Sequence, residues 1–200
     1  MIALAVMLLA AAMGGWLAIG GASPDVRSYA RFACVLYAAL AAAGATGVQL
    51  ALSVTLIVSA SAPVFLALAV RLSFRGPVMP LLVGAILSIA CVAGITAAAT
   101  GLAMLAFAPL LFSVVAMIAF SLRQLRNLRA QALQTIAASC ALLAGASAFT
   151  AGGVRAMPAL FLFSAAGLLG ILLALAPRSD VVVEQERVAD VRAGAIRQPR

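Results

Sequence analysis

Long apolar stretches alternate with short arginine-containing gaps along this sequence. After the apolar N-terminal stretch, one stretch without a charged residue runs from Phe32 to Val70 (39 residues), and another runs from Gly76 to Leu122 (47 residues). A third, from Ala130 to Pro177, is interrupted only by Arg155. A single helix of 39 residues would be about 58 Å long, whereas about 20 residues suffice to cross the hydrocarbon core of a bilayer. Each stretch is therefore predicted to form two membrane-spanning helices.

The apolar N-terminal stretch adds one more helix, which makes seven. Their approximate bounds are residues 1–21, 32–48, 50–70, 77–97, 101–122, 131–151 and 156–176. We therefore expect an all-α integral membrane protein, with a seven-helix transmembrane domain over residues 1–177 and a flexible cytoplasmic tail over residues 178–200. Alternatively, residues 1–22 are a cleaved signal peptide, although they lack the basic start of such peptides.

The arginines predict the orientation of these helices. With seven crossings, twelve of the thirteen arginines fall on one side of the membrane and only Arg155 falls on the other. Because short cytoplasmic loops are enriched in Arg, we expect the N-terminus outside and the C-terminus in the cytoplasm. Arg123, Arg126 and Arg129 then mark a cytoplasmic loop, and their spacing also suits contact with anionic lipid headgroups. Arg155 either extends to the outer interface or contacts an anion there.

The composition supports a membrane protein of bacterial origin. Hydrophobic residues make up 66% of the chain and charged residues 9%, outside the range of soluble domains. The chain has no lysine and 49 alanines, as is typical of GC-rich bacterial genomes, so we expect a multi-pass protein of the bacterial inner membrane. The net charge of +8 comes without any nucleic-acid-binding motif, so no nucleic-acid partner is expected.

A weak internal repeat relates two parts of the sequence. A shift of 106 positions places residues 34–60 on residues 140–166 with nine identities in 27 positions, including Cys34 with Cys140 and Gly47 with Gly153. The predicted second and third helices then correspond to the sixth and seventh. If the first corresponds to the fifth, the fourth links two parallel triplets in a 3+1+3 arrangement. Parallel repeats of this kind occur in transporters.

The residue types available for chemistry are few. The chain contains no histidine and no lysine, which excludes an imidazole base and a retinal Schiff base. The three cysteines share no ligand-like spacing and are interpreted as packing residues. All carboxylates lie in the first predicted loop or the tail, namely Asp25, Asp180, Glu184, Glu186 and Asp190. We therefore expect no enzyme, no cofactor, no metal site and no proton coupling through an intramembrane carboxylate.

The third predicted helix carries the densest set of uncharged polar residues. Ser59, Ser61 and Pro63 cluster near its middle and Gln49 lies near its outer end, so these four residues are the candidate substrate path. Pro63 should kink the helix, and a hydroxyl of Ser59 or Ser61 should help to satisfy the carbonyl that loses its donor. Trp16 and Tyr29 fit an aromatic belt near the cytoplasmic surface.

Two functions remain compatible with the sequence. The first is a carrier or facilitator for a weakly polar or lipid-like solute, which predicts polar groups that converge between the two triplets in mid-membrane. The second is a non-catalytic subunit that anchors or assembles a larger membrane complex, which predicts an apolar flank facing a partner. Membrane lipid is an expected partner in both cases, together with a protein partner or a second copy of the chain.

Overall fold

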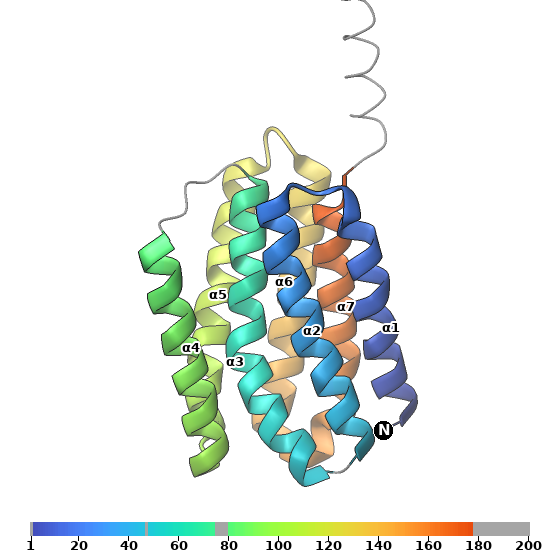
Figure 1. Cartoon of the computed structure of the whole chain (residues 1–200), viewed down its shortest axis with the longest axis vertical. Coiled ribbons are helices and arrows are strands. Elements are labelled where there is room, and N and C mark those ends of the chain that lie inside the picture. The colour runs from blue at the N-terminus through green and yellow to red at the C-terminus, as the bar shows by residue number, and fades with distance from the viewer. Residues whose placement is uncertain (1, 47, 75–79, 178–200) are drawn as a thin grey trace, which may run out of the picture.

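The structure, a computed structural model, describes residues 2–46, 48–74 and 80–177 (Figure 1). Within these ranges the chain is almost entirely helical and contains no β-strand. Its seven α-helices in these ranges are α1 (Ile2–Ala18), α2 (Pro24–Thr46), α3 (Val48–Ser73), α4 (Pro80–Thr100), α5 (Ala103–Gln124), α6 (Arg129–Gly152) and α7 (Met157–Leu175). Two short 3-10 turns, η1 (Ile19–Gly21) and η2 (Gly153–Ala156), follow α1 and α6. The predicted tail at residues 178–200 lies outside the described residues.

The largest difference from the predicted boundaries occurs at α2, which begins at Pro24 rather than at residue 32. Proline is favoured in the first turn of a helix, and the Asp25 carboxylate there interacts favourably with the helix dipole. The sequence-based boundary assumed that a membrane helix starts after its last charge. Arg27 and Arg31 instead belong to the first turns of α2, where long side chains can extend toward the interface.

Six stretches of the described chain are long and apolar enough to cross a membrane. Five of them correspond to single helices, from α1 to α5. The sixth, Arg129–Leu175, is 47 residues long and contains α6, η2 and α7. The chain is therefore an all-helical protein of the multi-pass membrane type.

Six of the described helices form a closed ring, and α4 lies outside it (Figure 1). Around the ring, α1 contacts α2, α2 contacts α3, α3 contacts α5, α5 contacts α6, α6 contacts α7, and α7 contacts α1. Helix α4 packs on the outside against α3 and α5. The order around the ring thus repeats after three helices, because α1, α2 and α3 are followed by α5, α6 and α7.

Helix ends and buried positions also correspond under the shift of 106. Ala18, the last residue of α1, maps to Gln124, the last residue of α5, and α2 maps to residues 130–152 within α6. Both members of the following pairs are buried: Leu8 with Val114, Ala33 with Ser139, Val58 with Ser164, Ala62 with Leu168, and Leu66 with Leu172. The end of α1 and the bounds of α2 therefore match those of α5 and α6 to within one residue, whereas α3 maps to residues 154–179 and α7 spans Met157–Leu175.

The contact between α6 and α7 depends on a glycine. A Cβ atom at Gly167 would lie 2.6 Å from Leu142 Cγ and 2.9 Å from the Ala138 carbonyl oxygen, distances at which a neighbour must move. The side-chain amide of Gln134 on α6 donates a hydrogen bond to the Gly170 carbonyl oxygen on α7, at 3.1 Å. Close backbone approach and an interhelical hydrogen bond are the usual ways in which helices associate in lipid.

The described arginines are unevenly distributed between the two ends of the bundle. One end, at the top of Figure 1, is where α2 and α6 begin and where α3 and α5 end. We call it the arginine end, because it holds Arg27, Arg31, Arg71, Arg123, Arg126 and Arg129. Arg155, in η2, lies at the opposite end.

Candidate functional site

The predicted substrate path in α3 does not form a single polar surface. The Ser61 side chain is buried and donates its hydroxyl to the Ile57 carbonyl oxygen at 2.7 Å. Its acceptor is therefore not the Ser59 carbonyl, which lacks a helical donor because Pro63 has no N–H. This corrects the expectation that Ser61 compensates for the proline. Gln49 is in the first turn of α3, and its side chain is outside what the structure describes.

Ser59 lies against a small void between the two triplets. The void has a volume of about 10 Å³, and Thr150 of α6 also borders it. Its remaining borders are apolar side chains of α3, α5 and α6, namely Leu56, Ala106, Phe107, Leu110, Ala146 and Phe149. A space of about 10–15 Å³ holds a single water molecule. The void is therefore too small for an organic solute.

Most buried hydroxyls in the helices are satisfied locally. Ser113, Thr135 and Ser139 each donate to the backbone carbonyl four residues earlier, at 2.7–2.8 Å. Two others, Thr55 and Ser121, have buried hydroxyl oxygens without a hydrogen-bond partner. A hydroxyl that donates to its own helix cannot donate to a solute without first breaking that bond, and only its oxygen can still accept a hydrogen bond. Among the described residues, polar groups do not converge in mid-membrane.

The larger hollows lie on the outside of the bundle, in the seams between neighbouring helices, and apolar side chains dominate their walls. One hollow of about 370 Å³ lies between α1 and α2, and one of about 490 Å³ lies between α1 and α7. Helix α4 borders two more, of about 540 Å³ and about 170 Å³, against α3 and α5. These volumes are suited to acyl chains or other apolar molecules that arrive from the membrane.

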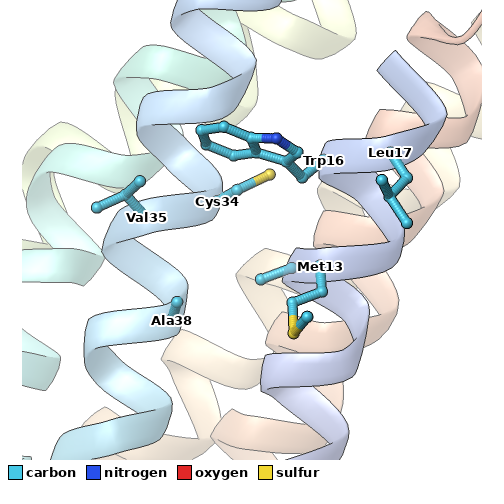
Figure 2. Close-up of a pocket in the computed structure, with 7 residues that line it drawn as sticks. Met13, Trp16, Leu17, Cys34, Val35 and Ala38 are labelled. Atoms are coloured by element: carbon cyan, nitrogen blue, oxygen red, sulfur yellow. The ribbon is translucent and has the colours of Figure 1, made fainter. Parts of the chain in front are cut away.

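The hollow between α1 and α2 is shown in Figure 2. We call it the α1–α2 groove, lined by Ala12, Met13, Trp16, Leu17, Cys34, Val35 and Ala38. The Trp16 indole lies beside the Cys34 side chain, which is only 3% exposed. The guanidinium carbon of Arg31 lies 4.6 Å from the centre of the Trp16 ring, within the range of a cation–π interaction. A positive charge is therefore held next to an apolar hollow.

A similar arrangement occurs at the same end of the bundle on α3. The guanidinium carbon of Arg71 lies 5.3 Å from the centre of the Phe120 ring of α5. Both residues line the hollow of about 170 Å³. The arginine end therefore contains two apolar hollows that each have an arginine and an aromatic ring beside them.

The predicted anion contacts occupy exposed positions at the two ends of the bundle. Arg123 lies in the last turn of α5, Arg129 begins α6, and Arg126 is in the turn between them. All three side chains are exposed, as contact with lipid headgroups requires. Arg155 is exposed in η2 and is far along the bundle from the other described arginines (Figure 1).

Sequence reasoning missed the pairing of Arg31 with Trp16. Trp16 was predicted only as part of an aromatic belt, and Arg31 was expected in a loop. The signal that identifies the pair is helix phase, since a helix that includes Arg31, as α2 does, places it on the same face as Cys34, Val35 and Ala38. In the part of the chain that the structure describes, no group of His, Cys, Asp or Glu side chains is suited to hold a metal ion.

No protein-family model, curated protein or solved structure matches this chain. Its function must therefore be argued from the chemistry of its own residues.

Proposed function

We propose that this chain is a small carrier of the bacterial inner membrane that moves a lipid-like solute. The observation that carries the proposal is the location of the hollows. Those large enough for an organic solute open on the membrane-facing seams, and two of them have an arginine at the arginine end. The void between the triplets is about the size of one water molecule. An amphiphile entering from the bilayer fits this arrangement better than a water-soluble solute does.

The proposed topology has seven crossings, with the N-terminus outside and the C-terminus in the cytoplasm. The apolar stretch Arg129–Leu175, with 47 residues, would be about 70 Å long as one helix, and α6 and α7 instead pack against each other. The concentration of described arginines at one end supports a cytoplasmic arginine end. A cysteine placed at Asn127 should therefore resist a membrane-impermeant maleimide in intact cells, and labelling there would contradict the orientation.

The ring order supports a 3+1+3 repeat. Helices α1 to α3 and α5 to α7 follow one another in the same order around the ring, and α4 lies outside as the linker. An odd number of helices in each triplet would invert the second triplet, so a single linking helix is needed to keep the two triplets parallel. Two parallel halves that rock against each other are a known basis for alternating access.

A lipid-transfer assay tests the carrier proposal. Purified protein is reconstituted into vesicles that contain a trace of phosphatidylglycerol with a fluorescent headgroup, and dithionite is added to bleach the outer leaflet. In protein-free vesicles the inner-leaflet fluorophore stays protected. We expect wild-type protein to expose it progressively, with a rate that increases with the protein-to-lipid ratio. If protection is the same with and without protein, the carrier proposal is wrong.

A second candidate function is a subunit of a larger membrane complex. It is favoured by the exposed α7–α1 seam, which is equivalent to the seam that α4 covers and could receive a helix of a partner. Helix α4 covers the α3–α5 seam, where Leu56 is 5% exposed and Ala60 is fully buried. At the equivalent positions of the second triplet, Leu162 is 47% exposed and Ala166 is exposed. Native mass spectrometry of protein extracted from its own host distinguishes the two functions. A stoichiometric partner protein supports the subunit, and a chain that retains only lipid supports the carrier.

A further inference from the structure

The α1–α2 groove extends from the arginine end toward the middle of the bundle. Trp16 and Leu17 are near the end of α1, and Ala12 and Met13 are one turn deeper. On α2 the order is reversed, so that Arg31 is nearest the arginine end and Ala38 lies deepest. The cation is therefore at the membrane-surface end of the groove, and the apolar part lies at the depth of the acyl chains. This order of polarity is the same as that of a phospholipid.

Arg31 lacks an anionic partner among the described residues. Its Nε atom is buried and has no hydrogen-bond partner. By contrast, the neighbouring Arg27 donates a hydrogen bond from its Nη1 atom to the Gly20 carbonyl oxygen at 3.0 Å. A guanidinium that is partly removed from water is costly unless an anion accepts its hydrogen bonds. Phosphate oxygens suit it, because a guanidinium donates charge-assisted hydrogen bonds to them in a fixed geometry.

Trp16 fixes the position of this cation. Its ring holds the Arg31 guanidinium by a cation–π interaction and at the same time forms part of the groove wall. The second triplet has neither residue, because Leu122 and Ala137 stand at the positions equivalent to Trp16 and Arg31. The combination of a cation, an aromatic ring and an apolar groove is therefore specific to one of the two equivalent seams.

We infer that the α1–α2 groove binds one anionic phospholipid, with its phosphate on Arg31 and one acyl chain along Met13, Val35 and Ala38. The Arg31 N–H groups donate to the phosphate oxygens. The acyl chain exchanges its contacts with surrounding lipid for contacts with the apolar walls of α1 and α2. This inference rests on the proposed carrier function, for which it names the solute class and the first binding site.

The single tryptophan of the chain makes this site measurable, since all tryptophan fluorescence comes from the groove. The intact protein is reconstituted in phosphatidylcholine vesicles, and lipids with brominated acyl chains, which quench tryptophan on contact, replace part of the lipid. Quenching by brominated phosphatidylglycerol is compared with quenching by brominated phosphatidylcholine at equal mole fractions. We expect about a fivefold preference for the anionic lipid, the factor expected for one arginine near a membrane surface.

The matched variants are Arg31→Gln and Arg71→Gln. Both remove one positive charge from the arginine end beside an aromatic ring, but only Arg31 contacts Trp16. Arg31→Gln should reduce the preference to about onefold and Arg71→Gln should retain it, while Arg31→Lys should restore part of it because the charge is kept. Retention of Trp16 emission at the same wavelength in each variant shows that the groove is still folded.

Two results would overturn the inference. One is equal quenching by the two brominated lipids in wild-type protein. The other is an equal loss of preference in Arg31→Gln and Arg71→Gln, which would assign the effect to the general surface charge of the arginine end. Failure of the carrier proposal is separate, because it is measured by dithionite bleaching. Selective quenching without lipid transfer would retain the binding site and reject the carrier.

Discussion

The α1–α2 seam and the α5–α6 seam occupy equivalent places in the two triplets, but their side chains differ. In the first seam, Cys34 is 3% exposed and lies beside the Trp16 indole (Figure 2). In the second seam, the equivalent Cys140 is exposed, and Leu122 stands at the position where α1 has the larger indole. The position equivalent to Arg31 carries no charge there, since it is occupied by Ala137.

This difference distinguishes the positions that determine helix packing from the exposed positions that could form a binding site. Some helix ends and several buried positions correspond between the triplets, as expected where the packing of apolar faces sets them. The exposed seam positions are under no such constraint, because lipid accepts almost any apolar residue there. An arginine at such a position is costly, so its presence in only one of these two equivalent seams points to a specific role.

The largest expected effect concerns the shared backbone plan. Gly167 of α7 corresponds to Ser61 of α3 under the shift of 106. Gly167→Ser should lower the free energy of unfolding by about 2 kcal/mol, as overpacking typically does, because its Cβ would collide with Leu142 and the Ala138 carbonyl. Thermal unfolding in detergent measures this.

The control for this substitution is Gly14→Ala on the outer surface of α1, where a Cβ meets no atom within 4 Å. It should not lower the unfolding temperature, because alanine is a better helix former than glycine. A wild-type melting temperature for Gly167→Ser would show that α6 and α7 do not pack as closely as described.

The second prediction transfers the site to the other seam. In a Trp16→Phe background, Leu122→Trp places the single tryptophan in the α5–α6 seam, and its quenching should show a weaker preference for anionic lipid than that of Trp16 in the wild-type groove. Addition of Ala137→Arg should increase this preference about fivefold, the effect of one arginine near the membrane surface.

The double variant without Ala137→Arg serves as the baseline for this comparison. An anionic preference in that baseline as strong as that of wild-type Trp16 would mean that both seams attract such lipids equally. The functional distinction between the two seams would then be lost.

The smallest effect is expected for a hydrogen bond beside Pro109 of α5, a proline that has no counterpart in α1. The Ser113 hydroxyl of α5 donates to the Pro109 carbonyl oxygen at 2.7 Å, whereas α1 has Met7 and Ala3 at the equivalent positions. Ser113→Ala should destabilise the protein by about 0.6 kcal/mol, the average for a hydrogen bond between polar side chains in membrane helices. The same thermal assay measures it, with the exposed Ser147→Ala as the control. A loss of stability several times larger would show that the hydroxyl does more in α5 than form one such hydrogen bond.

Much of the fold could be predicted from the sequence, because the arginines mark the ends of the apolar stretches. The spacing between Arg31 and Arg71 requires two helices, and the repeat around Cys34 and Cys140 relates helices that do occupy equivalent places in the ring. The start of α2 could not be predicted from charge alone. Its first turns contain charged residues that extend to the interface, and Pro24 determines where the helix begins.

The candidate site was harder to predict. The hydroxyl groups in the sequence predicted a substrate path at Ser59 and Ser61. In the structure, Ser61 is hydrogen-bonded within its own helix, and Ser59 borders only a water-sized void. The pairing of Arg31 with Trp16 depends on the rotation of α1 against α2. A single sequence contains the phase of each helix but not the relative rotation of two helices, which is set by packing across the whole bundle.

The central claim is that anionic phospholipid occupies the α1–α2 groove and not the equivalent α5–α6 seam. Photo-crosslinking would test this claim most directly. Wild-type protein is illuminated in vesicles containing phosphatidylglycerol with a diazirine in its acyl chain, and the adducts are mapped by peptide mass spectrometry. The account predicts adducts on residues 12–17 and 34–38, reduced by excess phosphatidylglycerol but not by phosphatidylcholine. Equal labelling of the equivalent residues 118–123 and 140–144 would contradict it.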